Sequence, residues 1–490
     1  MLTMKRLGSL VGLAALSIGI ACSNDLTVPN QNNPDVKRAL ASPQDVQKLA
    51  VSSVNSWYLT STYYLPLNML SVTADVLTCN FGNFGMRFNN VEPRIAYTNS
   101  SAADDGLVSF DTWSGNYQVL GAANDVLRAF ASGLSLGSPD TTDMFKHLAM
   151  FSQAAALTNL ALTFDQAFIV DETTDPAKEK PALKPYGEVT AAALAKWDAL
   201  IAATNGKSFE YDPTVLPLTG GPLTSARLNR IANTMAGLLT AYSARTAAER
   251  DAKVDWQKVL AYTTKGIGTG SAGAPFDFTV VGDNDQWYSY FLLYGDYPSW
   301  MRVDMRVIHL MDPSQPAEFD GTIPPPATGD KRLTTDFKFL GKVTGDPSRG
   351  VYMQSPYYHS RYEYHSWQSA TYATGPAPYI LAAESDLLRA EALIRTGGDF
   401  ATAAALINNT RVTRGGLTPA TAADGKAKLI DDIMYERDVE LMVTNGWELF
   451  RNRMEDRLRV GTVRHLPVPA KELEIQAMPI YTFGGAGHEM

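Results

Sequence analysis

Apolar residues recur at three- and four-residue spacing over most of the chain, a pattern typical of amphipathic α-helices. The first helix is expected to begin near residue 42, with Ser42 as its N-cap and Pro43 at its first position. Residues 111–131 show the helical spacing most clearly, through Trp113 and Tyr117. The same pattern predicts further helices over 147–168, 186–203, 228–248 and 254–267.

The helical pattern stops between residues 270 and 375, where the chain is rich in Gly, Pro, Asp and aromatic residues. It resumes afterwards, and small residues such as Ala390 and Ala403 would let neighbouring helices approach closely, as in tetratricopeptide-like helical hairpins. We therefore predict a mainly α fold, in which 42–490 form one helical domain and 270–375 a loop-rich, aromatic-rich insertion. The C-terminal helices are predicted over 379–396, 399–414 and 425–458, the first two ended by glycine pairs.

The first 21 residues have the features of a secretory signal peptide rather than of a folded domain. Lys5 and Arg6 precede an apolar run over 7–21, which is too short to cross about 30 Å of hydrocarbon as a helix. Cys22 follows a small residue, which resembles a bacterial lipoprotein signal, although Gly19 stands where such signals usually have Leu. We therefore predict lipidation of Cys22, and an extended polar tether over 22–41 that links the lipid to the domain.

Cysteine content and net charge exclude several classes of protein. If Cys22 is lipidated, Cys79 has no partner, so the exported domain must be held by its core and not by disulfides. Two cysteines are also too few for a cysteine-ligated zinc or iron–sulfur site. The formal net charge of −9 becomes −11 without Lys5 and Arg6, which disfavours a nucleic-acid partner.

Two stretches of the insertion, 287–300 and 352–372, hold fourteen of the chain's 49 aromatic residues. Tyr and Trp rings offer a flat apolar face and a polar tip, which suit the C–H face and the hydroxyl rim of a sugar. Binding groups also tend to collect in irregular segments of this kind. The alternative is that these rings pack the insertion onto the helices or contact a partner protein. We predict ligand contacts by Trp287, Tyr290, Tyr294, Trp300, Tyr358, Tyr362 and Trp367.

A polar loop over 75–97 is a third candidate for the ligand face, through Asp75, Asn80 and Arg87. By contrast, residues 283–285 (Asp, Asn, Asp) lack the glycine and the distal glutamate of a calcium loop, so an Asx-rich turn is the preferred interpretation. No two histidines have helical metal-ligand spacing around a glutamate. We therefore predict neither a metal site nor a cofactor.

Two short motifs resemble those of enzymes but occur in the wrong context. Residues 133–137 match a nucleophile elbow, yet a predicted helix stands where that motif needs a strand. Residues 268–273 match a dinucleotide fingerprint, but a helix precedes them and Pro275 follows. We therefore predict no enzymatic activity. An exported glycan hydrolase stays open as an alternative, because the separation of a catalytic carboxylate pair is a spatial property.

Several motifs follow one another in the C-terminal half of the chain. They are Glu384 with Arg389 and Glu391, Asn408 with Arg411 to Leu417, Tyr435-Glu436-Arg437 with Glu440, Asn445 to Arg451, and His465 to Pro469. This ordered set, with weaker matches at Ala74-Asp75 and Ala123-Asn124, resembles the SusD/RagB family of outer-membrane nutrient-binding lipoproteins. The family usually has Glu-Gly before an Arg-Trp pair, whereas this chain has Asn445-Gly446-Trp447-Glu448.

The resemblance implies a body of tetratricopeptide-like helices, with the middle of the chain forming a ligand face. It implies structural roles, at helix ends and in buried ion pairs, for Glu384, Glu391, Arg411, Arg437 and Glu440. It also implies a lipid-anchored protein on the outside of the outer membrane, which closes over a TonB-dependent (SusC-like) transporter and delivers a captured oligosaccharide to it. Alternatives are a peptide-binding member of the family, a glycan hydrolase, and a scaffold that binds only its protein partner.

Overall fold

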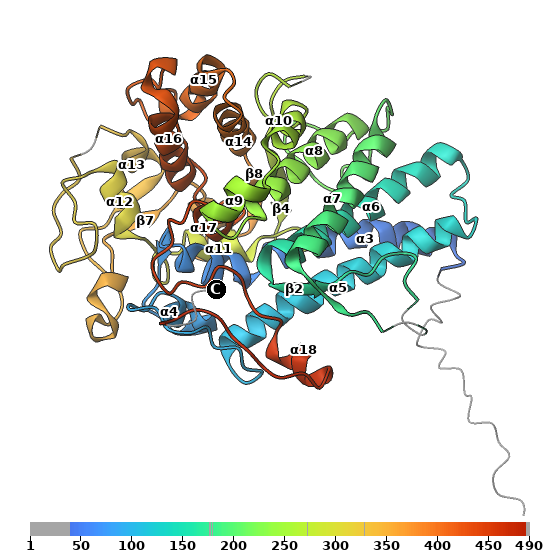
Figure 1. Ribbon diagram of the computed structural model, residues 1–490, viewed down its shortest axis with the longest axis horizontal. Helices are drawn as coiled ribbons and strands as arrows, with labels where there is room; N and C mark the ends of the chain where they lie inside the picture. Colours follow the sequence, from blue (N-terminus) through green and yellow to red (C-terminus); the bar gives the residue numbers. More distant parts are fainter. Residues whose placement is uncertain (1–39, 176–177, 179, 272, 328, 487–490) are drawn as a thin grey trace, which may run out of the picture.

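The computed structural model describes residues 40–175, 178, 180–271, 273–327 and 329–486 (Figure 1). The predicted signal peptide, the predicted lipidation site Cys22 and the predicted tether up to residue 39 lie outside the described residues. None of the described helices combines the length and the hydrophobicity that a membrane span needs.

The N-terminal half is a run of helices, as the apolar spacing predicts. Helix α3 (Pro43–Ser61) begins as expected, because the Ser42 side chain accepts a hydrogen bond from the Asp45 amide at 3.3 Å. The helices that follow are α4 (Met86–Asn89), α5 (Asp104–Ala131), α6 (Pro139–Thr163), α7 (Tyr186–Thr204), α8 (Ser225–Tyr242), α9 (Ala247–Lys253) and α10 (Trp256–Thr264).

The helix predicted over 111–131 begins earlier, at Asp104. Two further predictions in this half are wrong, and a capping residue explains each. The helix predicted over 147–168 begins earlier, because Ser138 caps it, and ends at Thr163. The helix predicted over 228–248 is two helices: α8 ends at Tyr242, and Thr246 caps a separate α9 by accepting a bond from the Glu249 amide at 2.9 Å. In both cases a hydroxyl side chain competes for backbone amides and sets the boundary.

The C-terminal helices are α14 (Ala382–Arg395), α15 (Phe400–Arg411), α16 (Gly425–Glu440), α17 (Glu448–Arg453) and α18 (Ala470–Ile475). The predicted helix 379–396 starts late because Tyr379 belongs to a strand. The predicted helix 425–458 is interrupted between α16 and α17. Gly446 lies there with a φ of 71°, and a Cβ on it would be 2.4 Å from Pro66 Cβ, so the chain must turn beside that proline.

The segment 270–375 contains short elements instead of long helices. Its helices are α11 (Tyr290–Gly295), α12 (Met305–Met311) and α13 (Arg332–Thr335), with one-turn 3₁₀ helices at 347–349, 351–353 and 363–365. The described strands pair only in twos, all antiparallel. The pairs are β1 (Leu77–Thr78) with β5 (Arg302–Val303), β2 (Gln166–Phe168) with β3 (Leu183–Pro185), β4 (Phe278–Asp283) with β8 (Thr374–Ile380), and β6 (Phe337–Phe339) with β7 (Tyr357–His359).

Long helices adjacent in sequence pack side by side, from α5 through α6, α7, α8 and α10 to α14, α15 and α16 (Figure 1). The predicted mainly α, tetratricopeptide-like fold is therefore confirmed. Two separate apolar cores hold it: a large one beneath most of the chain, and a smaller one within α14–α16 that includes Leu387, Ile407 and Ile433.

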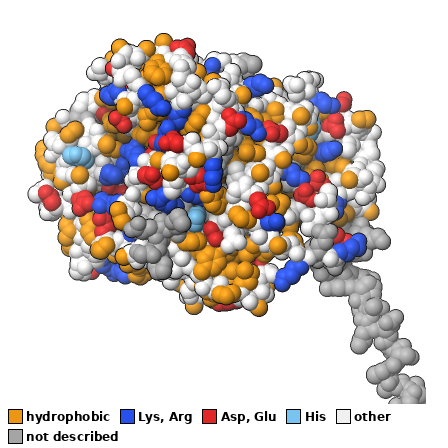
Figure 2. Space-filling view, viewed as in Figure 1, with side chains coloured by type: hydrophobic (Ala, Val, Ile, Leu, Met, Phe, Trp, Pro, Cys, Tyr) orange, Lys and Arg blue, Asp and Glu red, His pale blue; other side chains and the backbone are white. Residues whose placement is uncertain are grey.

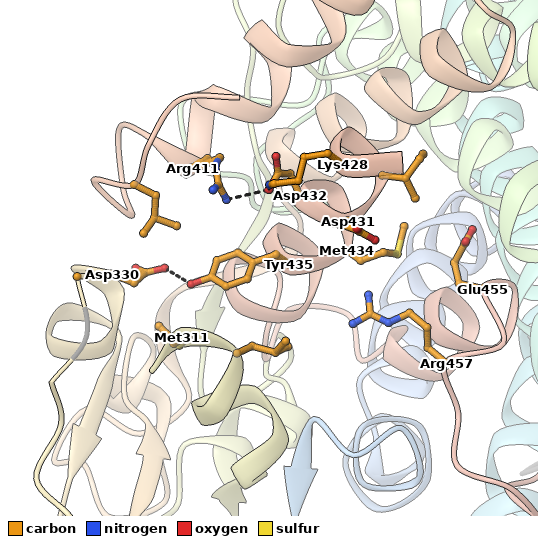
Figure 3. A pocket seen from close by; sticks show the side chains of 14 residues that line it. Met311, Asp330, Arg411, Lys428, Asp431, Asp432, Met434, Tyr435, Glu455 and Arg457 are labelled. Carbon is orange, nitrogen blue, oxygen red and sulfur yellow. Dashed lines mark hydrogen bonds and ion pairs between the residues drawn. The ribbon is translucent and has the colours of Figure 1, made fainter. Parts of the chain in front are cut away.

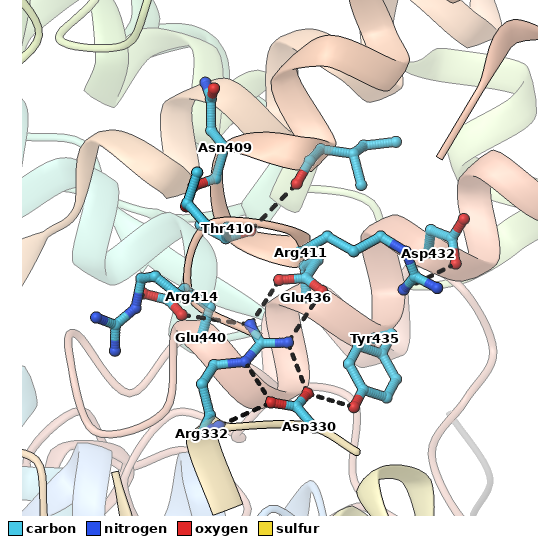
Figure 4. Close-up of polar contacts among 12 residues, drawn as sticks. Asp330, Arg332, Asn409, Thr410, Arg411, Arg414, Asp432, Tyr435, Glu436 and Glu440 are labelled. Carbon is cyan, nitrogen blue, oxygen red and sulfur yellow. Dashed lines mark hydrogen bonds and ion pairs between the residues drawn. The ribbon is translucent and has the colours of Figure 1, made fainter. Parts of the chain in front are cut away.

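Buried ion pairs connect α14–α16 to the rest of the molecule (Figure 4). Arg332 reaches Glu436 and Glu440 of α16, while Arg437 pairs with Glu391 at 2.7 Å within the helical unit. Glu384 accepts bonds from Asn445 and Arg451 at 2.7 and 3.1 Å. The structural roles expected for these carboxylates and arginines are therefore confirmed by their ion pairs.

Candidate functional site

A group of ten aromatic side chains brings together residues that lie far apart in the sequence. We call it the aromatic band; it consists of Tyr63, Tyr64, Phe84, Tyr288, Tyr290, Tyr294, Tyr297, Trp300, Trp367 and Tyr372. Each ring lies within 6.5 Å of another ring of the band, measured between centroids. None is fully buried, and Trp367 and Tyr372 are 54% and 37% exposed.

Short helix α11 places the centre of the band. Its Ser289 cap accepts a bond from the Leu292 amide at 3.2 Å, and residues four apart share one helical side, so Tyr290 and Tyr294 point the same way. The Phe291 amide donates to the Thr62 carbonyl at 2.9 Å, which fixes α11 against the end of α3. The Trp367 amide donates to the Leu293 carbonyl at 3.0 Å, and this bond joins the second aromatic stretch to the first.

Four rings of the band are nearly parallel. Tyr294 lies 4.7 Å from Trp300 at an interplanar angle of 12°, and 6.3 Å from Trp367 at 19°. Tyr290 continues the row at 6.4 Å from Tyr294 and 10°. Stacked rings of this kind favour one another, and Trp367, which is 54% exposed, is accessible to a flat ligand.

A cleft of about 390 Å³ adjoins the band at Tyr63, Tyr288 and Tyr290. Its opposite wall is a polar stripe on α5, made of Asp111, Ser114, Gly115 and Gln118, whose spacing of three and four residues puts them on one helical face. Gly115 lets α5 approach α3 closely, because a Cβ there would lie 2.8 Å from the Thr60 side chain. The cleft thus has aromatic rings on one side and hydrogen-bonding groups on the other.

Burial shifts the pKa values of the titratable groups in this cleft. It raises the pKa of the Asp111 carboxyl, an effect that Lys471 partly offsets. Burial, Asp111 and Tyr290 raise the pKa of Tyr63, and burial together with Tyr290 raises the pKa of Tyr288 to about 12. The two phenols are therefore neutral at pH 7 and can donate hydrogen bonds, and the carboxyl oxygens of Asp111 can accept them.

The structure unites four of the seven aromatic residues predicted to bind ligand: Tyr290, Tyr294, Trp300 and Trp367. Trp287 is only 4% exposed and packs against Tyr58 at 5.7 Å, so burial removes it from the ligand face. Tyr362 is buried as well. Tyr358 is mostly buried and lines a separate pocket of about 370 Å³, where its hydroxyl donates to Glu363 at 3.1 Å.

The loop predicted as a third ligand segment is mainly structural. Asp75 is buried and forms ion pairs with Arg94 and, at 3.3 Å, with Arg459. Asn80 is buried and exchanges two hydrogen bonds of 3.0 and 2.9 Å with the backbone of Asp346. Arg87 is half-buried, and its guanidinium lies 4.8 Å from the centre of the Phe88 ring. Asp75 and Asn80 are thus excluded from the ligand face because their polar atoms are already bonded within the fold.

Sequence analysis missed Tyr63, Tyr64 and Phe84. Tyr63 and Tyr64 follow directly after the last turn of α3, and two adjacent rings at a helix end cannot both face one core, which is a signal that could have found them. Phe84 stacks on Tyr64 at 4.0 Å from an irregular backbone position with a φ of 52°. No periodic pattern marks such a residue.

The structural contexts argue against the other motifs. Asp283 Oδ1 accepts bonds from the Asp285 and Trp287 amides at 2.9 and 2.7 Å, which confirms the Asx-turn interpretation. Residues 133–137 lie in the loop between α5 and α6, and the described residues of the second motif, 268–271 and 273, precede strand β4 rather than a helix. No cluster of three or more potential metal ligands occurs within the described part of the chain.

Residues 276–465 match the sequence pattern of the SusD family. No curated protein shows significant sequence similarity to the chain. Among solved structures, a SusD superfamily protein of Bacteroides vulgatus is 16% identical, with a TM-score of 0.58 over 89% of this chain and 97% of that protein. The surface glycan-binding protein A of Bacteroides uniformis is 14% identical, with a TM-score of 0.58 over 90% and 99%.

A SusD-like carbohydrate binding protein of Bacteroides vulgatus is 17% identical, with a TM-score of 0.56 over 84% of this chain and 83% of that protein. Identities this low establish a common fold and nothing finer, whereas the sequence match covers the irregular middle and most of the C-terminal helices. The sequence match over 276–465 and the shared fold together confirm the predicted resemblance to the SusD/RagB family.

Proposed function

We propose that this protein is a non-catalytic surface lipoprotein that captures an oligosaccharide on the aromatic band and in the adjoining cleft. The observation that carries the proposal is the row of nearly parallel rings from Tyr290 through Tyr294 to Trp300 and Trp367. Such rings can cover the C–H faces of successive sugar units, while Asp111, Gln118 and the tyrosine hydroxyls bond sugar hydroxyls. The names of two similar structures, a surface glycan-binding protein and a SusD-like carbohydrate binding protein, agree with this class of ligand.

The composition of the cleft favours binding over hydrolysis. Most glycoside hydrolases use two carboxyl groups on either side of the scissile bond. Of the described residues that line this cleft, Asp111 alone carries a carboxylate. The 370 Å³ pocket has two lining carboxylates, Asp296 and Glu363, and both are already bonded within the fold. Asp296 is engaged by His359 and by the Tyr362 amide, each at 2.7 Å, and Glu363 by Lys338 at 2.7 Å and by the Tyr358 hydroxyl at 3.1 Å.

The proposal is tested by screening the purified domain against an array of plant and microbial glycans, followed by calorimetry and product analysis. Saturable binding without released products, weakened by Trp300→Ala, supports capture. Turnover of a bound glycan would favour the hydrolase. Binding of peptides and no glycan at the band would favour the peptide-binding alternative, and the absence of both ligands would leave only a scaffold role.

We further propose that the mature chain is anchored through lipid on Cys22, faces outside, and passes its ligand to a TonB-dependent transporter. An exposed hydrophobic surface suits such a partner. This apolar face consists of Phe88, Ile95, Leu107, Val460, Ile475, Met478 and Ile480. Figure 2 shows hydrophobic side chains gathered at the lower edge of the molecule, over α18 and its surroundings.

Hydrogen bonds hold the two segments of the apolar face side by side. The Tyr97 amide donates to the Phe483 carbonyl at 2.9 Å, and the Ser101 hydroxyl donates to Glu474 at 2.9 Å. Monomeric proteins rarely expose contiguous apolar patches beyond a few hundred Å² unless these bind something. The face also borders the sugar cleft, because Leu107 lies one helical turn before Asp111 on α5. A transporter that covered this face would therefore meet the bound ligand.

A further inference from the structure

A second cleft, of about 790 Å³, lies between α12, the end of α15 and α16, and shares no lining residue with the sugar cleft (Figure 3). It runs along the boundary between the small core of α14–α16 and the insertion, a common place for ligand sites. Its apolar lining is aliphatic and sulfur-containing: Leu310, Met311, Leu417, Ile430 and Met434. Unbranched methionines adapt to side chains of varied shape.

The one ring in this cleft, among its described lining residues, is unsuited to stacking on a sugar. Tyr435 donates its hydroxyl to Asp330 at 2.6 Å, and Asp330 in turn pairs with Arg332 at 2.9 Å. The guanidinium carbons of Arg332 and Arg411 lie 5.7 and 5.9 Å from the centre of the Tyr435 ring. The Tyr435 ring is thus held in place by its hydrogen bond, and two guanidinium groups lie near its face. By contrast, Trp367 of the aromatic band is exposed.

The cations that line the cleft already have carboxylate partners from this chain. Arg411 pairs with Asp432 at 3.2 Å, and Lys428 also pairs with Asp432. Arg457 pairs with Asp438 at 3.1 Å. In Figure 3 the group of Arg411, Asp432 and Lys428 lies on one side of Tyr435 and Met311 on the other.

Two acidic residues of the cleft have carboxylate oxygens that could accept a further hydrogen bond or ion pair. Asp431 is exposed, lines the cleft and forms no ion pair with any described residue. Asp432 is 4% exposed and uses Oδ1 for both of its cations, whereas its Oδ2 is buried without a hydrogen-bond partner. A buried carboxylate oxygen without a donor is costly, so a ligand that brings a donor to this wall would be favoured.

We propose that this cleft is a second binding site, which takes an extended peptide carrying a basic side chain between aliphatic ones. The basic group would meet Asp431 and the free side of Asp432, and the aliphatic groups would lie against Leu417, Met311 and Met434. A neutral glycan would leave both the aliphatic walls and the carboxylates poorly matched, and an anionic side chain in the same place would be repelled by Asp431. The site is separate from the aromatic band, so both ligands can be bound at once.

The test uses three fluorescein-labelled peptides: one with a lysine between two leucines, and matched peptides with glutamate or alanine in its place. Anisotropy titrations with the whole mature domain should show saturable binding of the lysine peptide, at least ten-fold tighter than of the glutamate peptide. Asp431→Asn should weaken the lysine peptide about three- to ten-fold, and Leu417→Ser should weaken the lysine and alanine peptides alike. Both positions are at least partly exposed, so both variants should fold, which their urea midpoints would verify.

Trp300→Ala is the control, because it alters the aromatic band and not this cleft. It should leave peptide binding unchanged, while Asp431→Asn should leave glycan binding unchanged. The proposal is overturned if no peptide binds saturably, if the three peptides bind equally, if Asp431→Asn has no effect, or if Trp300→Ala abolishes peptide binding. The first three outcomes do not bear on the sugar site, which the glycan screen tests separately, whereas the last would place the peptide on the aromatic band.

Discussion

Arg332 and Glu436 form a doubly bonded ion pair in which neither side chain has any exposed surface (Figure 4). Nη1 donates to Oε2 at 2.6 Å and Nη2 to Oε1 at 3.1 Å. Arg332 also donates to Asp330 at 2.9 Å and to Glu440 at 3.3 Å. One guanidinium therefore holds three carboxylates between the insertion and α16, and these carboxylates raise its pKa against the effect of burial.

Arg332→Met should strongly destabilise the protein, because it leaves three carboxylates in the interior without their shared cation. Breaking a buried pair by removing one partner costs about 3–5 kcal/mol. The loss is measured as a fall in the urea midpoint. Arg349→Met is the matched control, since Arg349 is partly exposed and lies 3.8 Å from exposed Asp346; it should change stability by about 1 kcal/mol or less. Equal losses in the two variants would contradict the structural role of Arg332.

Trp300→Ala should lower glycan affinity, because it removes a ring that stacks on Tyr294 within the band. An aromatic contact is worth about 1 kcal/mol or more, so we expect a fall of roughly five-fold or greater in calorimetry. Trp256→Ala is the control, because Trp256 lies on α10 and belongs to neither cleft. The guanidinium carbon of Arg395 lies over the Trp256 ring, 4.9 Å from the ring centre. If both variants bind glycan like the unmodified protein, the band is not the binding surface.

Glycan affinity should fall at acidic pH if Asp111 accepts hydrogen bonds from the ligand. Burial raises the pKa of Asp111 above its ordinary value of 3.8, so protonation and the loss of affinity should begin at a higher pH than for a free carboxyl. Asp111→Asn mimics the protonated state, so its binding should be weaker and should not change with pH. The measurement runs from about pH 4 to pH 7, the range in which a carboxyl with a raised pKa titrates. A pH dependence that persists unchanged in Asp111→Asn would assign it to another group.

The sequence predicted helices well where one apolar face alone decides the structure, as in α5 and α7. It failed where a distant residue decides it: the gap between α16 and α17 depends on Gly446 meeting Pro66, nearly 400 positions earlier. In the candidate ligand face, too, the sequence predicted what depends on local pattern and failed where distant residues decide. Both aromatic stretches were visible, but whether a ring is exposed depends on tertiary contacts, such as those that bury Trp287 on Tyr58 and leave Trp300 on Tyr294 half-exposed.

The free energy of unfolding should fall as the pH drops below about 6.5, partly because of His465. Burial, with Arg245 and Arg464 nearby, lowers the pKa of His465 to about 3, so between pH 3 and 6.5 the folded state binds fewer protons than the unfolded chain. Stability from this residue is therefore present above pH 6.5 and lost on acidification, by roughly 2 kcal/mol at pH 5.

His465→Phe should remove this part of the pH dependence, because it fills the site beside Phe483 without a titrating group. The measurement is the difference in urea stability between pH 7 and pH 5, which should be smaller in the variant than in the unmodified protein. His147, whose pKa burial lowers to about 4, provides an independent check with the same sign. An unchanged difference in His465→Phe would show that the fold does not force His465 to stay neutral.

Charges on the apolar face should weaken transporter binding without affecting the sugar site. Val460 and Ile475 are 83% and 66% exposed, so Val460→Asp with Ile475→Asp should cost little folding stability. A partner that buried these side chains would have to desolvate two carboxylates, and co-purification with the transporter should fall at least ten-fold. Val351→Asp is the control, because Val351 is also exposed, at 42%, but lies outside the face. Glycan affinity should stay unchanged in all these variants. If co-purification survives the double charge substitution but not a substitution elsewhere, the transporter docks on another surface and the apolar face needs a different partner.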